Sequence, residues 1–295
     1  MYTDSVDIID HKVKKKSKLA EVWLRIKKNK TAMAGLTVLL IFTLLAIFAE
    51  VISPYERAIT INARERLKAP NSENYFGTDA FGRDLFTRVL HGSRVSLTIG
   101  LFTTFFSVIV GGLLGATAAY YGGKLDNIIM RLMDVLTCIP GILLALAIIA
   151  ALGPDLRNLL IAITIASVPG FTRLTRSVIL TVAEQDFIEA AKSYCTRDFR
   201  IIVKYILPNA MGPIIVQATM SIAGTILAAA GLSYIGMGIQ PPNPEWGAML
   251  SEAQVFMRTA PYLLFFPGAC ILFSALSFNL VGDGLRDALD PKLRD

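Results

Sequence analysis

The chain has 295 residues, of which 54% are hydrophobic and 18% charged, and its formal net charge is +6. Soluble domains carry about 25% charged and about 45–50% apolar residues, so this composition excludes a soluble enzyme, a disulfide-rich secreted domain and a disordered tail. Charge-poor runs alternate with short charged segments, and a helix of about 20 apolar residues crosses the hydrocarbon core of a bilayer. The sequence therefore predicts a polytopic membrane protein.

The first 32 residues are polar and basic, and an apolar run at 33–53 follows them. That run is long enough to span the membrane, so we expect it to stay in the protein rather than to be removed as a signal peptide. Before it, Leu19, Val22, Trp23 and Ile26 recur at helical spacing, with lysines on the other faces. This pattern predicts an amphipathic helix in the membrane interface, with a solvated basic tail as the alternative.

Five further apolar segments predict transmembrane helices, which makes the fold class all-α with six spans. Gly111 and Gly115 stand four residues apart in the second span, a spacing that lets helices approach closely in lipid. Spans two to six are expected at residues 93–119, 127–151, 159–172 with its flanks, 212–235 and 262–281.

Most of the 29 basic residues lie in the N-terminal tail, in segment 173–208 and near the C-terminus. Because cytoplasmic loops collect Lys and Arg, we expect both termini in the cytoplasm. The chain then divides into an N-terminal region, residues 1–92, with the first span and a long outer loop, and a core, residues 93–295, with spans two to six.

The predicted spans hold almost no ionisable side chains at mid-membrane depth, where ion-coupled carriers and proton relays place them. Arg131 and Asp134 stand three residues apart in the third span, and we expect them to pair on one helical face. The two His and three Cys residues are scattered, so no metal site is predicted. An ion-coupled secondary carrier is therefore the disfavoured alternative, and the energy for transport is expected to come from a partner.

The fifth span carries a polar stripe. Gln217, Ser221 and Thr225 stand at i, i+4 and i+8 and project to one side of the helix. The stripe is a candidate for a hydrated translocation path. Hydrogen bonding between helices, eased by neighbouring small residues, explains it equally well.

Segment 184–209 is too polar to span the membrane and too regular for a simple loop. Its apolar residues predict two short helices joined by a turn near 194–196. Pro208 is expected to end the second helix and to begin the next span. The predicted product is a compact cytoplasmic knob that fits a groove on a partner.

Two short motifs in this segment, Glu189-Ala190-Ala191 and Leu207-Pro208, resemble the EAA coupling loop of ABC importer permeases. The resemblance implies that the loop docks in a cleft of a cytoplasmic ATPase subunit. The two alanines allow close approach, and Glu189 offers a charge for pairing.

Two other residues complete the expected coupling loop. Arg197 offers a positive charge to the partner. Cys195 stands where the family usually has Gly, and Gly would ease a tight turn at that position.

Sequences at 76–79 (FGTD), 82–85 (GRDL), 241–247 and 278–287 resemble the dipeptide/oligopeptide/nickel permeases, in particular the second or "C" permease. We expect Arg83 and Asp84 to serve local structure rather than to touch substrate. The helix that begins at Leu85 has one apolar face, and we expect it to rest on the outer membrane face.

The resemblance implies a subunit of the bacterial cell membrane that moves peptides by alternating access, with a nickel chelate or glutathione as alternative substrates. It also implies a homologous permease, two cytoplasmic ATP-binding subunits and an extracytoplasmic solute-binding protein as partners. The chain lacks a GxxxxGK[ST] phosphate loop. We therefore expect no catalysis and no cofactor on this chain, with ATP and Mg²⁺ bound by the ATPase subunits.

Overall fold

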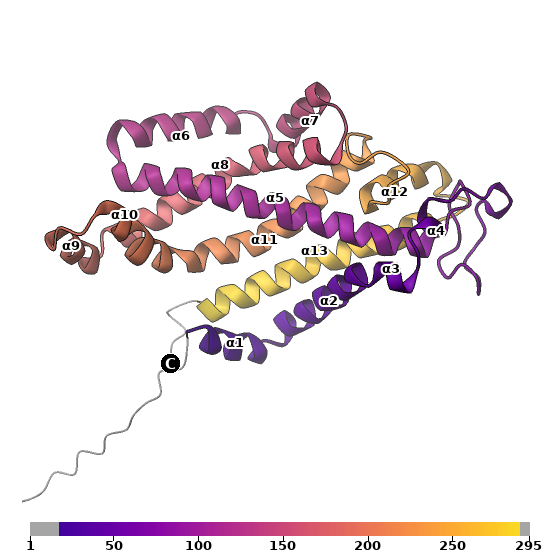
Figure 1. Cartoon of the computed structure of the whole chain (residues 1–295), viewed down its shortest axis with the longest axis horizontal. Helices are drawn as coiled ribbons and strands as arrows, with labels where there is room; N and C mark the ends of the chain where they lie inside the picture. Colours follow the sequence, from indigo (N-terminus) through magenta and orange to yellow (C-terminus); the bar gives the residue numbers. More distant parts are fainter. Residues whose placement is uncertain (1–17, 290–295) are drawn as a thin grey trace, which may run out of the picture.

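The computed structural model describes residues 18–289, and over this range the chain is helical, with no strand. Five helices are long and apolar enough to cross a membrane. They are α2 (Lys30–Ile47), α5 (Leu85–Tyr121), α8 (Leu156–Ala183), the helix Ile202–Tyr234 that contains α11 (Leu207–Tyr234), and α13 (Tyr262–Leu289). Figure 1 shows these helices running along the long axis of the molecule. The all-α fold predicted from the sequence is confirmed.

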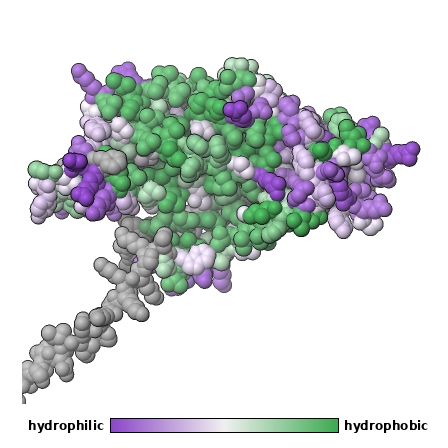
Figure 2. Space-filling model, in the orientation of Figure 1, coloured by the Kyte–Doolittle hydropathy of each residue, from purple (hydrophilic) through white to green (hydrophobic). Residues whose placement is uncertain are grey.

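Shorter helices lie at the two ends of this bundle. They are α1 (Lys18–Lys28), α3 (Ala49–Ile52), α4 (Glu56–Ile59), the 3₁₀ turns Ala63–Glu65 and Gln254–Phe256, α9 (Asp186–Ser193), α10 (Asp198–Ile201) and α12 (Trp246–Ala253). In Figure 1, α9 and α10 lie at the end opposite α4 and α12. Figure 2 shows hydrophobic residues over the middle of the molecule and hydrophilic residues at these ends, the distribution that a bilayer requires.

The predicted amphipathic segment forms α1, and the rest of the predicted tail, residues 1–17, lies outside the described residues. Asn29 separates α1 from α2 and caps α2 by accepting hydrogen bonds from the amides of Thr31 and Ala32, both at 3.1 Å. The Asn29 amide also donates to Asp287 at the end of α13, at 3.3 Å. The beginning of the first span is thereby fixed to the end of the last.

The prediction of one uninterrupted third span at 127–151 is wrong. The chain forms two helices there, α6 (Gly123–Thr137) and α7 (Gly141–Leu152), bent by 83° at the break. Pro140 lies in the break, and proline both lacks an amide donor and pushes the residue before it out of the helical region. The described residues therefore hold five spans, or six if this bent pair is counted as one.

The glycines of the second span mark its closest helix contact. A Cβ atom placed on Gly111 would lie 2.7 Å from the Cβ of Phe171 in α8. One placed on Gly115 would lie 2.4 Å from the carbonyl oxygen of Thr172. No side chain fits at these distances, so the packing predicted for these glycines is confirmed.

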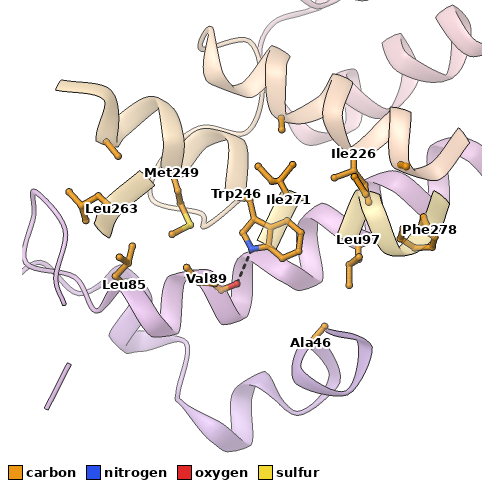
Figure 3. Packing of buried hydrophobic residues seen from close by; sticks show 14 of the residues in the cluster. Ala46, Leu85, Val89, Leu97, Ile226, Trp246, Met249, Leu263, Ile271 and Phe278 are labelled. Atoms are coloured by element: carbon orange, nitrogen blue, oxygen red, sulfur yellow. Dashed lines mark hydrogen bonds between the residues drawn. The ribbon is translucent and has the colours of Figure 1, made fainter. Parts of the chain in front are cut away.

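The helix that begins at Leu85 does not rest on the membrane face as expected, because it is the first part of α5. Leu85 and Val89 are buried in a cluster around Trp246, which is fully buried. Figure 3 shows the Trp246 indole against Val89, and its Nε1 donates to the Val89 carbonyl oxygen at 3.0 Å. The apolar face therefore packs against α12 and α13 instead of lipid.

Candidate functional site

Segment 184–209 folds into the predicted helical pair. Helices α9 and α10 are joined by a turn and lie at the end of the bundle opposite α4 and α12 in Figure 1. Ile188, Ile201 and Ile206 are buried and pack against Ile179 and Val182 of α8. Each buried isoleucine contributes about 1.5–3 kcal/mol, so the pair is held firmly against the bundle.

The other face of the pair is open to solvent. Glu189 and Ala190 are exposed on α9, and Arg197 is exposed in the turn. Ala191 is buried, at 8% exposure, and packs toward the bundle. Of the two alanines, only Ala190 therefore lies on the surface that a partner can reach.

A hydrogen bond ties this segment to a second helix. The hydroxyl of Tyr120, at the end of α5, donates to Asp198 of α10 at 2.6 Å. Tyr120 was not identified from the sequence, because the two residues are 78 positions apart. Through this bond and the buried isoleucines, α5 and α8 both hold the helical pair.

The turn between α9 and α10 places Cys195 in the left-handed region, with φ at 50°. Its side chain is exposed and its thiol is free. The next amide, of Thr196, donates to the carbonyl oxygen of Ala191 at 3.3 Å and closes the turn. The position where the family usually has Gly thus has the backbone conformation that favours Gly.

Pro208 does not end the second helix, contrary to the prediction. The chain passes from α10 through a π-helical segment, Ile202–Ile206, directly into α11. In an α-helix the proline ring would clash with the carbonyl of Lys204, and the wider π turn relieves this crowding. Leu207 and Pro208, both exposed, lie inside a continuous helix from the helical pair into the bundle.

The polar stripe of α11 lines a cleft of about 620 Å³ between α8 and α11. Gln217, Ser221 and Thr225 all contribute to its wall, and the Gln217 amide donates to the Ser221 hydroxyl at 3.3 Å within the same helix. The facing wall includes Ser167 and Gly170 of α8. A second cavity, of about 400 Å³, shares Gln217 and continues along α11 toward the end of α13.

An apolar cluster lies beyond one end of this cleft. Ile163 belongs both to the cleft wall and to the cluster. Leu159, Leu232 and Ile239 are further members of the cluster. We call this cluster the apolar layer, and its buried members are Ile99, Ala145, Ile149, Leu159, Ala162, Ile163, Ala229, Leu232 and Ile239.

The expected pair between Arg131 and Asp134 is not formed. Asp134 instead accepts a hydrogen bond from Arg173 of α8 at 2.8 Å. Farther along the same two helices, Arg176 binds both oxygens of Asp126 at 2.6 Å. Arginine fits a carboxylate best when both groups meet in one plane, and partners on two helices allow this. These pairs hold α6 against α8 beside the cleft.

A buried ionic network organises the loop before α5. Arg83 contacts Asp79 and Glu252, both at 2.6 Å, and Arg88 contacts the same two carboxylates at 3.1 Å. Asp84 caps α5 by accepting from the Thr87 amide at 2.9 Å. Arg83 and Asp84 therefore serve local structure, as predicted. Arg88 and Glu252 were not identified from the sequence, because their proximity depends on how α12 packs.

Each carboxylate of this network is neutralised by guanidinium groups. Over residues 18–289, no three His, Cys, Asp or Glu side chains lie close enough together to hold a metal ion. The described part of the chain offers an exposed helical pair, a cleft with a polar stripe and an apolar layer.

Comparison with known proteins shows that this chain is similar to membrane components of transport systems. Residues 97–295 match the family model of the binding-protein-dependent transport system inner membrane component. Residues 17–70 match the N-terminal TM domain of oligopeptide transport permease C. The solved structure of the methionine ABC transporter MetNI in inward-facing conformations has a similar fold, with a TM-score of 0.60 and 16% identity over 70% of this chain and 98% of that one.

Closer relatives are found among curated proteins. The dipeptide transport system permease protein DppC of Alkalihalophilus pseudofirmus is 48% identical over 274 residues, which cover 93% of this chain and 90% of the relative. The glutathione transport system permease protein GsiD of Escherichia coli is 44% identical over the same shares of both chains.

Proposed function

The chain belongs to the family of binding-protein-dependent transport system inner membrane components, in the dipeptide and oligopeptide branch of ABC importer permeases, and on this premise we propose that it carries short peptides across the bacterial plasma membrane. It is a multi-pass membrane component with several apolar helices. Its relatives include a dipeptide permease and a glutathione permease. Glutathione is itself a tripeptide, so both relatives support a short peptide rather than a nickel chelate.

The observation that carries the mechanism is the unbroken helix from Ile202 to Tyr234. At one end it continues from α10 in segment 184–209, and farther along it presents Gln217 to the cleft. This continuous helix, which includes the π-helical segment Ile202–Ile206 and Pro213, links the helical pair to the middle of the bundle, so a displacement of its end can reach the cleft. Segment 184–209 is therefore our proposed coupling segment, and the stripe of Gln217, Ser221 and Thr225 is the proposed translocation path.

Coupling requires one element that both sites bias between two states. The exposed Glu189, Ala190 and Arg197 form the proposed docking face for an ATPase subunit. Closure of the ATPase pair would move the coupling segment as a rigid body, and the helix it continues into would open or close the cleft.

The proposed complex contains a homologous permease, two cytoplasmic ATP-binding subunits and an extracytoplasmic solute-binding protein. ATP and Mg²⁺ would be bound by the ATPase subunits, with no catalytic residue supplied by this chain. We also propose the division into an N-terminal region, residues 1–92, and a transport core, residues 93–295.

The test replaces the charge on the proposed docking face. Glu189→Arg should abolish uptake of a labelled dipeptide and uncouple ATP hydrolysis, while the protein remains inserted in the membrane at wild-type amounts. Glu56→Arg is the matched control, because Glu56 is also an exposed acidic residue but lies in α4, outside the coupling segment. Unchanged uptake in cells that express Glu189→Arg would exclude the proposed coupling segment. Uptake assays with unlabelled glutathione as competitor would separate the two peptide substrates.

A further inference from the structure

A third cavity, lined in part by charged side chains, lies on the other side of the apolar layer from the cleft. It has a volume of about 450 Å³ and is lined by residues from four separate segments of the chain, 50–55, 91–95, 154–156 and 239–244. Glu50, Arg94 and Asp155 line it and are exposed to solvent. Cavities of this size hold small ligands. It lies at the end of the bundle that the charge pattern predicts to be extracytoplasmic.

Three side-chain oxygens in this cavity, which we call the outer pocket, have no hydrogen-bond partner among the described residues. Glu50 and Asp155 each use one carboxylate oxygen on a backbone amide, that of Tyr55 at 3.4 Å and that of Arg157 at 3.0 Å. The Gln240 side-chain nitrogen donates to two carbonyl oxygens of its own loop, both at 3.1 Å. One oxygen each of Glu50, Asp155 and Gln240 therefore has no partner within residues 18–289.

The pocket also offers donors. Arg94 uses Nε and one terminal nitrogen on the carbonyl oxygens of Ala46 and Ile47, at 3.0 and 3.2 Å. Its other terminal nitrogen is left for a ligand. Asn243 accepts from the Tyr55 hydroxyl at 3.0 Å through its side-chain oxygen, which leaves its side-chain nitrogen as a donor.

The position of the pocket relates it to the cleft. Leu156 and Ile239 line the pocket, and Ile239 also belongs to the apolar layer. Ile163, seven residues along α8 from Leu156, belongs to the layer and lines the cleft. Seven helical residues span about 10 Å. The pocket and the cleft therefore lie on opposite sides of one thin apolar layer, along the same helix.

We propose that the outer pocket binds the amino-terminal end of a short peptide before the peptide passes the apolar layer into the cleft. An α-ammonium group donates three N–H groups to acceptors such as these side-chain oxygens, and the two carboxylates against one guanidinium favour a cationic group. The donors of Arg94 and Asn243 suit the carbonyl or carboxylate oxygens of the same peptide. This inference rests on the proposed function as a peptide permease.

The test measures binding to the purified full chain in lipid nanodiscs, with alanylalanine as the probe. Wild type should bind alanylalanine at least about tenfold more tightly than N-acetyl-alanylalanine, since acetylation removes the charge and two donors. Glu50→Gln and Asp155→Asn should each weaken alanylalanine binding by about tenfold without affecting the acetylated probe. Both changes preserve shape, and Asn is as good a helix cap as Asp, so α8 keeps its N-terminus. Glu56→Gln, in α4 outside the pocket, is the control.

Equal affinity for both probes, or wild-type affinity in both Glu50→Gln and Asp155→Asn, would refute the proposal that the outer pocket binds the amino-terminal end of a peptide. Uptake of labelled alanylalanine by the complete transporter in proteoliposomes decides the function separately. Wild-type uptake with an unchanged KM in both variants would support the permease function and refute the role of the outer pocket in peptide binding. Absence of uptake by wild type would instead refute the peptide permease.

Discussion

The turn at Cys195 yields a sharp prediction about the proposed coupling segment. Cys195 holds φ at 50°, where a residue with a Cβ atom is strained by about 1–2 kcal/mol. Its side chain is exposed and its thiol is free, so replacing it with glycine removes no packing that the fold requires. Glycine relieves the strain but loses about 0.5–1 kcal/mol through its larger freedom in the unfolded chain. Cys195→Gly should therefore stabilise the turn by about 0.5–1 kcal/mol.

Hydrogen exchange at the Thr196 amide measures this difference, because that amide closes the turn by donating to Ala191 at 3.3 Å. A gain of about 0.5–1 kcal/mol corresponds to exchange slower by about two- to fivefold. Cys195→Ala should leave the rate unchanged, since alanine keeps the Cβ atom while removing the thiol. Ser193→Gly, at the end of α9, should speed exchange, because glycine weakens a helix.

The reasoning would be refuted if Cys195→Gly accelerated exchange at Thr196, or if Cys195→Ala slowed it as much as Cys195→Gly did. The first result would mean that the thiol holds the turn together. The second would mean that the thiol, not the backbone, is unfavourable there.

Three further perturbations test the packing. Gly115→Ala would place a Cβ atom 2.4 Å from the Thr172 carbonyl oxygen, so it should lower the free energy of unfolding of the purified chain by about 1–3 kcal/mol. Gly112→Ala is the control, because no atom lies within 4 Å of its Cβ position and its stability should not change. Equal melting temperatures for the two variants would contradict the close contact at Gly115. Tyr120→Phe removes the hydrogen bond to Asp198 of α10, which stabilises that helix by about 1 kcal/mol, so the rate of amide hydrogen exchange in α10 should rise about fivefold. An unchanged rate would show that the buried isoleucines alone hold α10 in place. Glu252→Ala leaves the buried guanidinium groups of Arg83 and Arg88 with one carboxylate fewer, so it should lower the free energy of unfolding by about 3–5 kcal/mol. A melting temperature equal to that of wild type would contradict this prediction.

Features set by local chemistry were predictable from the sequence. Apolar runs of sufficient length located the spans, because a helix must satisfy its own backbone in lipid. The two helices of segment 184–209 followed from their apolar spacing, and Gly111 and Gly115 followed from their separation by one turn. The break at Pro140 also had a local signal, the proline itself, which the length of the apolar run obscured.

Other features depend on residues that only folding brings together. Asp134 pairs with Arg173 of α8, 39 positions away, instead of Arg131 on its own helix. The continuation of the helix through Pro208 required a π turn, whose geometry no residue pattern in this chain revealed.

The composition and the apolar runs by themselves determined that this is an all-helical membrane protein with several spans, and the motifs predicted where a partner would bind. Only the tertiary structure decided which polar atoms face a cavity and which face one another. Gln217 lines a cleft and Glu50 an outer pocket, and each cavity is formed by segments that are far apart in the sequence. The physical reason is that the length and periodicity of a helix are local properties, whereas a cavity is defined by the packing of helices distant in sequence.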